Sequence, residues 1–561
     1  MNEETEVWKK YSEGVDYKNS IGLFKDVNDN LKFYSGDPWE GVKTNGLPVT
    51  SLPLVRRIVN HKISIVGGDE VKINYSVDGV DDLDTNPDKM KLKEISKYLS
   101  AYAMTLWENL HETDKNNEAL LDAALSGDGI EYFDWDSSIN AGNKIKGNIV
   151  SEIVDNVNYF PGNPNNPDVQ TQPEILIVFR KMVEDLKKEA KANGISKDEY
   201  DGITDDNETE NQAGSMARIE LAKTGKCLCF LKMWKKDGKV FFNKSTRYSR
   251  ITKGDIDSGL TQYPVAVFNW YLRKNCAHGL TEVKGIIPNQ MAINKLVSMI
   301  ILAVMHVAIP KMIYDANTMA APSNLIGGAI GVNGDPNQVA KYLTPGQLSN
   351  DIYKVVDLLI DKTKEMLGAT DAALGELNMD NTSALTVLQK ASAIPSKPIS
   401  ARYHRFIEDK ARIWMDFFIH KYNVSRTLTY TDEGVTRTFD FDGTKYGDLQ
   451  WRVKVDVGAS THWSEITAIQ TLDNLLMNQH ITFVEYLDRM PNGIIPMKEK
   501  LMQSRAAQDE DRQVMMKLLA DKIDQLPPEQ REAILALPPE QIEAAVKQLI
   551  MQEQPPEQAA F

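Results

Sequence analysis

The sequence contains little cysteine and no long hydrophobic run. Three cysteines in 561 residues cannot form a disulfide framework, so packing must hold the fold, as expected in a reducing cytoplasm. The polar N-terminus, MNEETEVWKKYSEG, lacks the apolar core of a signal peptide, and we expect no export by that route. The longest uncharged apolar stretch, 296–310, is shorter than the ~20 residues that cross a bilayer. It predicts a buried helix, with a re-entrant membrane segment as the second interpretation.

Excess positive charge and the common enzyme motifs are also missing. The 64 Lys and Arg residues against 79 Asp and Glu give a net charge of −15, so any DNA contact must be local or weak. Gly225-Lys226 is followed by Cys227, which breaks the phosphate-binding pattern G-x-x-x-x-G-K-[ST] and argues against an ATP motor. The eight histidines form no H-E-x-x-H motif, which disfavours a zinc hydrolase. We predict no metal and no cofactor.

The composition that remains, 42% hydrophobic and 25% charged, is that of a globular protein with three to four structural units. Its first third mixes helical and strand patterns. Residues 53–66 predict a half-buried helix whose solvent side carries Arg56, Arg57 and Lys62. Residues 92–125 predict a second helical region, and the EYFDWD segment that follows alternates like a strand.

Two contrasting segments come next. Residues 198–210 carry seven acids and no base, which predicts a mobile solvated loop; a calcium loop is disfavoured because Lys197 would occupy its first ligand position. Residues 216–270 alternate short apolar runs with turn signals, which predicts an antiparallel meander. Cys227 and Cys229 would share one face of a strand there, and we expect core cysteines in preference to a metal site.

The centre of the chain predicts two helices around a compact insert. Residues 288–309 form one long apolar pattern closed by Pro310, and residues 348–367 form an amphipathic pattern stopped by Gly368. The segment between them is rich in Gly, Asn and Pro. Two helices of similar length on either side of such an insert predict a stalk with a small head.

The C-terminal part is predicted to contain a helical segment, then a strand-rich segment, then further helices. Residues 383–424 predict a helix that Pro395 and Pro398 should kink or break. Residues 426–457 predict a hairpin region with Asp442-Gly443 as a turn. The last hundred residues predict helices, one opened by a capping box over Thr482–Glu485, and Pro-Pro-Glu-Gln occurs three times at unequal spacing.

Several blocks follow one another along most of the chain: FYSGDPW, LPLVRRIV, ALLDAALSGDGIEYFDWD, FPGNPNNPDVQTQP, QYPVAVFNWYLRKNCAHGLTEVKGIIPNQMAINKLVSMII and TSALTVLQKASAIPSKPISARYHRFIEDKARIWMDF. In this order they resemble the portal protein of tailed bacteriophages, the ring-shaped connector at one capsid vertex. None of the blocks is a catalytic fingerprint, and their shared order carries the resemblance. The Pro-Pro-Glu-Gln repeats depart from the family.

The resemblance implies an α+β portal fold that assembles as a ring oligomer. Its implied parts are a mixed α/β wing, a two-helix stem, a small α/β clip, a tunnel loop, a long kinked wing helix and an α-helical crown. In this sequence they correspond to a wing at 1–287, a stem helix at 288–309, a clip at 310–345, a stem helix at 346–368, a tunnel loop at 369–382, further wing at 383–460, and crown and tail at 461–561.

By the same resemblance, the chain is a non-enzymatic dodecameric channel through which double-stranded DNA enters during packaging and leaves during ejection. The implied partners are the large terminase subunit, scaffolding and major capsid proteins, head-completion or adaptor proteins and tail proteins. The implied location is the virion, after assembly in the host cytoplasm, with no membrane contact.

Candidate site residues follow from these parts. Twelve copies of an acidic tunnel loop would disfavour static phosphate contacts. The candidates are Asp371, Glu376, Asn378, Asp380 and Asn381 in the tunnel loop, Lys354, Lys362 and Lys364 in the stem, and Lys311, Asn324, Asn333, Asp335 and Lys341 in the terminase-docking clip.

Two alternatives remain open. The first is a metal-dependent DNA-processing enzyme, such as a nuclease of a mobile element, built on Asp168, Glu189 and Lys191, although side chains two apart on a helix do not converge. The pair Asp440 and Asp442 is an equivalent candidate. The second alternative is a membrane-embedded channel, favoured only by residues 296–310.

Overall fold

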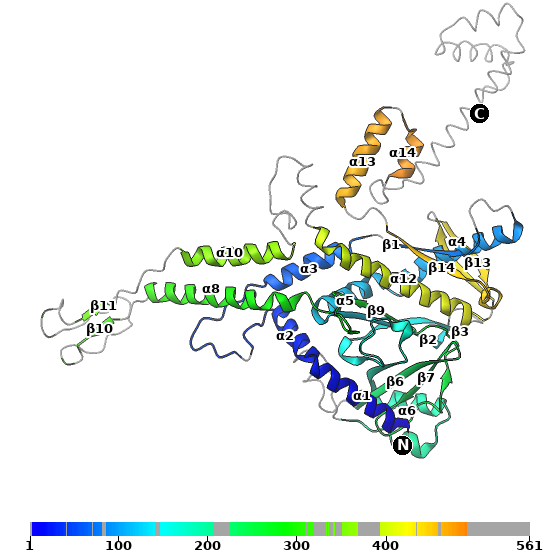
Figure 1. Cartoon of the computed structure of the whole chain (residues 1–561), viewed down its shortest axis with the longest axis horizontal. Helices are drawn as coiled ribbons and strands as arrows, with labels where there is room; N and C mark the ends of the chain where they lie inside the picture. The colour runs from blue at the N-terminus through cyan, green and yellow to red at the C-terminus, as the bar shows by residue number, and fades with distance from the viewer. Residues whose placement is uncertain are drawn as a thin grey trace, which may run out of the picture. The chain divides into compact units, whose positions relative to one another are not determined.

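The computed structural model describes residues 3–40, 42–69, 71–80, 86–140, 146–206, 225–308, 312–315, 317, 333, 335, 340–342, 351–368, 393–423, 425–432, 435–457, 462–478 and 480–490. The chain divides into two compact units, Met1–Ser460 and Thr461–Phe561, which are described separately. It mixes helices with antiparallel sheets, which confirms the mixed α and β composition predicted from the sequence (Figure 1).

Five helices form the N-terminal part of the first unit. The predicted helix at 53–66 is confirmed as α3, but the helical region predicted at 92–125 is two helices, because His111 between them takes a left-handed backbone conformation with φ of 54°. The five are α1 (Glu3–Ser20), α2 (Leu23–Ser35), α3 (Leu54–Val66), α4 (Pro87–Asn109) and α5 (Glu112–Ser126).

Lys62 of α3 corrects the predicted solvent face of that helix. Arg56 and Arg57 are exposed as expected, but the Lys62 side chain is 4% exposed. A buried ammonium group requires a partner, and Glu282 supplies it from 220 residues away. Helical periodicity assigns every charged side chain to the solvent side, so it could not show this pair.

Two antiparallel sheets form the middle of the first unit. The three-stranded sheet has the order β3-β2-β9 and the five-stranded sheet the order β4-β5-β6-β7-β8. The strands are β2 (Asp128–Asn140), β3 (Lys146–Ile153), β4 (Tyr159–Pro161), β5 (Glu174–Met182), β6 (Lys226–Lys236), β7 (Lys239–Ser245), β8 (Ile256–Asp257) and β9 (Val265–Asn269). Cys227 and Cys229 of β6 are buried, which confirms them as core residues.

The meander predicted over 216–270 is confirmed only for β6, β7 and β8. Strand β9 leaves it and pairs with β2, with Asp128 opposite Asn269. The helix α12 (Lys397–His420) holds the segment before β9 and the last residue of the strand, because Asp416 accepts the backbone N–H of Thr261 at 2.8 Å and Arg402 donates to the carbonyl of Asn269 at 3.2 Å. Sequence alternation identifies a strand but not its neighbour.

The acidic loop prediction is confirmed in part for the described residues 198–206, because Asp198, Glu199, Asp201 and Asp205 are exposed, although part of the segment is helical. The short helix α7 (Lys197–Asp201), which follows α6 (Val183–Ala192), occupies the start of this region. Asp206 accepts the backbone N–H of Leu228 at 2.9 Å and pairs with Arg180 at 3.4 Å, so its partly buried carboxylate is bound to the sheet. Residues 207–210 lie outside the described residues.

The predicted break at Pro395 and Pro398 is confirmed for the described residues from 393 onward, because the α-helical pattern is interrupted there and a new helix begins. A short 3-10 turn, η5 (Ile394–Ser396), leads into α12, and Pro398 lies in the first turn of that helix. Backbone N–H groups of a first turn have no partner inside the helix, so a proline there removes no hydrogen bond. The predicted helical residues 383–392 lie outside the described residues.

The predicted hairpin region has a different connection. Strands β12 (Arg426–Asp432) and β13 (Val435–Phe441) form the hairpin, while Asp442-Gly443 opens the 3-10 turn η6 (Gly443–Tyr446) instead of a hairpin turn. Beyond it, β14 (Trp451–Val457) pairs with β1 (Val71–Val77), far away in the sequence.

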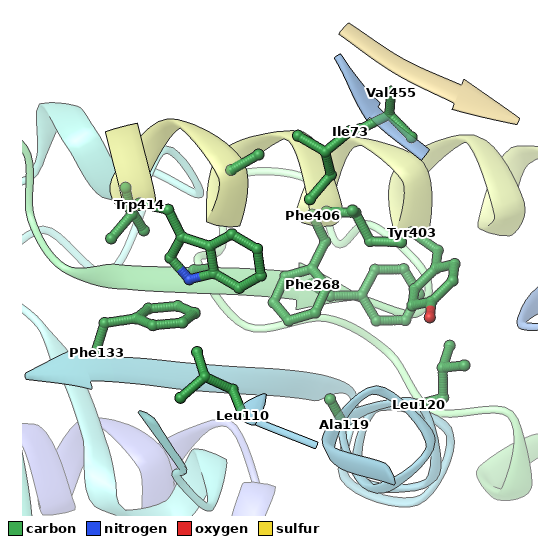
Figure 2. Packing of buried hydrophobic residues seen from close by; sticks show 14 of the residues in the cluster. Ile73, Leu110, Ala119, Leu120, Phe133, Phe268, Tyr403, Phe406, Trp414 and Val455 are labelled. Carbon is green, nitrogen blue, oxygen red and sulfur yellow. The ribbon is translucent and has the colours of Figure 1, made fainter. Parts of the chain in front are cut away.

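The core of the first unit is an aromatic layer between α12 and the elements beneath it. Figure 2 shows Trp414 and Phe406 of α12 pointing toward Phe133 of β2 and Phe268 of β9. Ring centroids are 6.3 Å apart for Phe133 and Trp414 and 6.1 Å for Phe268 and Phe406. Truncating one of these buried rings to alanine costs about 3–5 kcal/mol. We refer to this layer as the α12 core.

The described part of the second unit contains α13 (His462–Met477) and α14 (Phe483–Arg489). The predicted capping box is confirmed, because Thr482 and Glu485 exchange side-chain and backbone hydrogen bonds at the start of α14. Tyr486 donates to Asp473 at 2.6 Å and joins the two helices. The Pro-Pro-Glu-Gln segments lie outside the described residues.

Candidate functional site

Two helices run side by side away from the sheets. The helices predicted at 288–309 and 348–367 are α8 (Ile287–Ala308) and α10 (Asp351–Met366). In Figure 1 the two green helices lie together, with the short strands β10 (Met312–Tyr314) and β11 (Ala340–Tyr342) beyond their far ends. These strands pair in antiparallel fashion, with Met312 opposite Tyr342. We call α8 and α10 the helix pair.

The apolar side chains of α8 face solvent. The side chains of Met299, Val304, Met305 and Val307 are between 51% and 55% exposed. The helix has a mean hydropathy of 1.9 over its most apolar window, yet only 17% of that window is buried. The expectation of a helix buried within the chain is therefore wrong. A helix that is hydrophobic on all sides is normally covered, so α8 requires another surface.

The dimensions of α8 bear on the membrane alternative. The whole helix has 22 residues, and it is the one described helix that is long and apolar enough to cross a bilayer. This helix is longer than the apolar stretch 296–310 on which the sequence-based expectation depended. Its first turns are fixed to the body by polar contacts, which leaves residues 296–308, or ~20 Å at 1.5 Å per residue. A bilayer core is about 30 Å thick.

Gln290 fixes the base of α8 to the start of α3. Its Oε1 accepts the backbone N–H groups of Leu54 at 3.1 Å and Val55 at 3.3 Å, and its Nε2 donates to the carbonyl of Leu52 at 2.6 Å. Asn294 extends this contact by accepting from Nε2 of Gln290 at 2.9 Å. The first N–H groups of a helix lack partners inside it, and α3 has no side-chain cap of its own. Gln290 therefore serves as its cap.

A buried ion pair fixes the segment that leads into α8. Glu282 accepts from Nζ of Lys62 at 2.7 Å through one oxygen, and from Nε1 of Trp270 at 2.8 Å and the hydroxyl of Tyr271 at 2.9 Å through the other. Burial raises the pKa of Tyr271, and the Glu282 carboxylate acts in the same direction. Both carboxylate oxygens of Glu282 accept hydrogen bonds, so these contacts hold the segment before α8 in one position.

Contacts within the helix pair are few among the described residues. Nδ2 of Asn289 donates to Oγ1 of Thr363 at 3.0 Å, and Oγ1 donates to the carbonyl of Leu359 at 2.6 Å. Val356 and Thr363 are the buried residues of α10, while Leu358 is 55% exposed. The pair therefore covers only a narrow face of each helix.

The three predicted stem lysines all lie on α10. Lys354 pairs with Asp351 at 3.3 Å and Lys362 with Glu365 at 2.6 Å, each one turn along the helix. The hydrogen bond to Glu365 raises the pKa of Lys362. Lys364 is half-buried. The exposed surface of α10 thus mixes these ion pairs with apolar side chains, among them Val355 at 45% and Leu358 at 55%, whereas the exposed side of α8 is mainly apolar.

Most of the other predicted site residues lie outside the described residues. Lys341 belongs to β11, and Asn333 and Asp335 are exposed. The remaining candidates, for which the structure gives no position, are Lys311, Asn324, Asp371, Glu376, Asn378, Asp380 and Asn381.

The carboxylates of the nuclease alternative each have a local structural contact. Asp168 accepts the backbone N–H of Gln170 at 3.0 Å and caps a 3-10 turn, η2 (Val169–Thr171), and Glu189 pairs with Lys244 at 2.8 Å. Asp440 accepts from Thr427 across the hairpin at 2.6 Å. The part of the chain that the structure describes holds no group of three His, Cys, Asp or Glu residues arranged for a metal. This alternative stays a prediction.

A second buried charge cluster was missed by the sequence analysis. Lys410 of α12 contacts Glu112 of α5, Glu131 of β2 at 2.8 Å and Asn116 at 2.7 Å, and the three charged side chains are fully buried. Burial raises the pKa of Glu112 to about 7; Lys410 opposes this shift and Glu131 adds to it. The cluster thus joins α5, β2 and α12 through side chains that are closed to solvent. Its members lie up to 298 residues apart, which leaves no local signal.

A scan against models of protein families and a search of curated proteins found no match for the chain. The fold and the site define an α+β protein with a body of antiparallel sheets and a helix pair that exposes apolar side chains.

Proposed function

We propose that the chain is the portal protein of a tailed bacteriophage, which forms a dodecameric ring at one capsid vertex and conducts double-stranded DNA during packaging and ejection. The exposed apolar surface of α8 is the observation that carries this proposal, because that surface requires a cover that the described chain does not provide. The sequence blocks that resemble phage portal proteins, in their shared order along the chain, are the reason to propose a portal ring and not another assembly.

Ring symmetry accounts for both faces of the helix pair. In a cyclic ring each subunit uses one face against a different face of its neighbour. The apolar side of α8 suits burial between subunits, whereas the ion pairs of α10 suit a surface in contact with water. The hydrogen bonds of Gln290 and the Lys62–Glu282 ion pair would hold the helix pair at the same angle in every subunit of the ring.

The net charge of −15 supports sliding in preference to tight binding of DNA. In this proposal the tunnel-loop acids face the phosphates and keep the duplex centred, and the clip docks the large terminase subunit, which supplies the packaging energy. Scaffolding, capsid, adaptor and tail proteins contact the ring from outside.

Electron microscopy of the purified chain is the direct test. We expect annular particles with a central hole, and native mass spectrometry should give about twelve times 63.1 kDa. A chain that stays monomeric at high concentration and inside mature virus particles would contradict the proposal.

A separate experiment addresses the channel chemistry. Asp371, Glu376 and Asp380 are changed together to Asn, Gln and Asn, and DNA packaging and genome retention are measured in assembled particles. We expect impaired translocation, because phosphates would make longer-lived contacts with a neutral loop. Unchanged packaging and retention would refute an electrostatic role for the loop without touching the ring itself.

A further inference from the structure

A pocket lies where the three-stranded sheet, the five-stranded sheet and the last turn of α12 meet. Strand β9 begins only at Val265, so β2 has no partner strand on that edge beyond Tyr132. Pro264 supplies one more acceptor, because its carbonyl accepts the backbone N–H of Phe133 at 2.8 Å, but it has no N–H of its own to continue the ladder. An irregular segment therefore borders β2 in place of a strand, and the pocket opens beside it.

Apolar side chains form most of the wall of this pocket. They come from β6, β7, the segment before β9 and α12, and they include Met233, Val240, Phe242, Leu260 and Phe417. The pocket has a volume of about 120 Å³. An apolar cavity of about 150 Å³ accommodates benzene, so this one has room for an aliphatic chain of about three or four carbons and not for a whole aromatic ring.

Lys421, just beyond the end of α12, brings an ammonium group to this apolar space. A Cβ placed on Gly259 would lie 3.7 Å from Nζ of Lys421. Gly259 lies between Ser258 and Leu260, and both of these residues line the pocket together with Lys421. The Lys421 side chain is half-buried, yet its Nζ is open to solvent. Among the residues that the structure describes, this Nζ has no hydrogen bond and no carboxylate within 4 Å.

Two further charged side chains line the pocket. Lys244 pairs with Glu189 at 2.8 Å, so its charge is already balanced. Asp134 is exposed and accepts the backbone N–H of Trp135 at 2.8 Å. The pocket thus holds one ammonium group that lacks a close partner and one carboxylate at its solvent side.

The environment of Lys421 favours an added negative charge. Burial lowers the pKa of Lys421, and the more distant carboxylates Asp134 and Asp257 oppose this shift. Asp257 forms its own ion pair with Lys239 at 3.2 Å. Lys421 therefore loses hydration without gaining a close carboxylate, which is unfavourable for a cation. An anion with an apolar chain would contact both the ammonium group and the walls.

We propose that this pocket binds a small organic carboxylate, with the carboxylate on the ammonium group of Lys421 and a short aliphatic chain against the apolar walls. Such a combination of apolar walls with a single placed charge is usual for small-ligand sites. The carboxylate can belong to a free short-chain acid or to a glutamate side chain of a peptide. The proposal does not depend on ring assembly.

The test uses the full chain and compares butyrate with butyramide, which has nearly the same shape and no charge. Titration followed by saturation-transfer NMR should show saturable binding of butyrate, and butyramide should bind at least about tenfold more weakly, the usual worth of a hydrogen bond to a charged group. Equal binding of the two probes, or no saturable binding of butyrate, would overturn the proposal. Inorganic phosphate should bind more weakly than butyrate; equal binding would mean that the apolar walls contribute nothing and would also overturn it.

A further probe distinguishes the two sources of the carboxylate. N-acetyl-glutamate methylamide presents a glutamate side chain on a peptide backbone. Tighter binding of butyrate supports a free short-chain acid as the ligand. Equal or tighter binding of the glutamate derivative supports a peptide.

Three variants localise the binding. Lys421→Met removes the ammonium group but keeps most of the apolar stem, and it should erase the preference for butyrate over butyramide. Asp134→Asn removes the like charge beside the ligand and should tighten butyrate binding about two- to fivefold, a gain that partial unfolding could not produce. Lys236→Met is the matched control, because Lys236 is exposed at the end of β6, and butyrate binding should not change. Circular dichroism confirms folding of each variant; a preference for butyrate that persists in folded Lys421→Met contradicts the proposed site.

Discussion

The α12 core and the helix pair differ in which side chains they bury. In the α12 core even the charged residues Lys410, Glu112 and Glu131 are fully buried and paired. In α8, by contrast, apolar side chains such as Val304 and Met305 are about half exposed. The interactions that stabilise the body are thus present within one chain. The apolar surface of the helix pair, in contrast, remains in contact with water in the single chain and would be stabilised by burial. Assembly would supply that burial without altering the body.

The buried lysine of the α12 core should give the largest effect on stability. Lys410→Met leaves two carboxylates in the interior without a cation. Breaking a buried ion pair in this way costs about 3–5 kcal/mol, and urea denaturation should show that loss in the free energy of unfolding. Adding Glu112→Gln to the same chain should recover part of it, because one buried charge is removed. A loss below ~1 kcal/mol in the single variant would show that solvent reaches the cluster.

The same cluster should make stability depend on pH. The pKa of Glu112 is raised to about 7 in the folded chain, so the folded state binds its proton more tightly than the unfolded state. The resulting stabilisation is complete below the ordinary carboxyl pKa and is lost as the pH rises to about 7. Glu112→Gln should remove this loss, which amounts to at most about 1.4 kcal/mol per pH unit for one proton.

Urea denaturation at pH 5, 6, 7 and 8 measures the difference between the two proteins. The free energy of unfolding of the wild type should fall relative to that of Glu112→Gln across this range. Parallel curves for the two proteins would mean that Glu112 is ionised throughout, with Lys410 dominating its pKa. Asp122→Asn is a useful comparison, since burial raises the pKa of Asp122 to about 8 and its own loss should extend to higher pH.

Removing the hydrogen bonds between Gln290 of α8 and the start of α3 should have an intermediate effect on the free energy of unfolding. Gln290→Ala removes the acceptor of the Leu54 and Val55 N–H groups and leaves the start of α3 uncapped, which costs about 1–2 kcal/mol. Hydrogen exchange should accelerate at those two amides. Asn289→Ala is the matched control one residue away, because it loses only the contact with Thr363 and should leave both amides protected. Equal exchange in the two variants would show that α8 does not cap α3.

Local pattern predicted the elements of both regions better than their contacts. The helices α3 and α8 and the capping box at Thr482 follow from short-range spacing, and the structure confirms them. The partners of Lys62 and Lys410 could not be predicted, because they lie 220 and 298 residues away and carry no local signal. The strand β9 was assigned to the wrong sheet for the same reason.

The candidate site shows a different limit of sequence reasoning. Apolar composition predicted burial of the segment 296–310, yet α8 is exposed within its own chain. The spacing of apolar residues indicates that a helix surface is buried, but it does not indicate whether the same chain or another chain buries it. This is the physical reason that an assembly surface resembles a core helix in the sequence.

The exposed face of α8 should give the smallest effect on folding and the clearest effect on assembly. Val304→Glu with Met305→Glu places charge on side chains that are 52% and 51% exposed, so the subunit should change by no more than about 0.5 kcal/mol in its free energy of unfolding. In the proposed ring the same charges would be buried without partners, and sedimentation velocity should show that the large species is lost. Leu272→Glu is the control on the body, where the side chain is 58% exposed, and it should leave assembly intact. Rings that persist in the double variant would place the subunit contact elsewhere, and the exposed α8 face would then need a different partner.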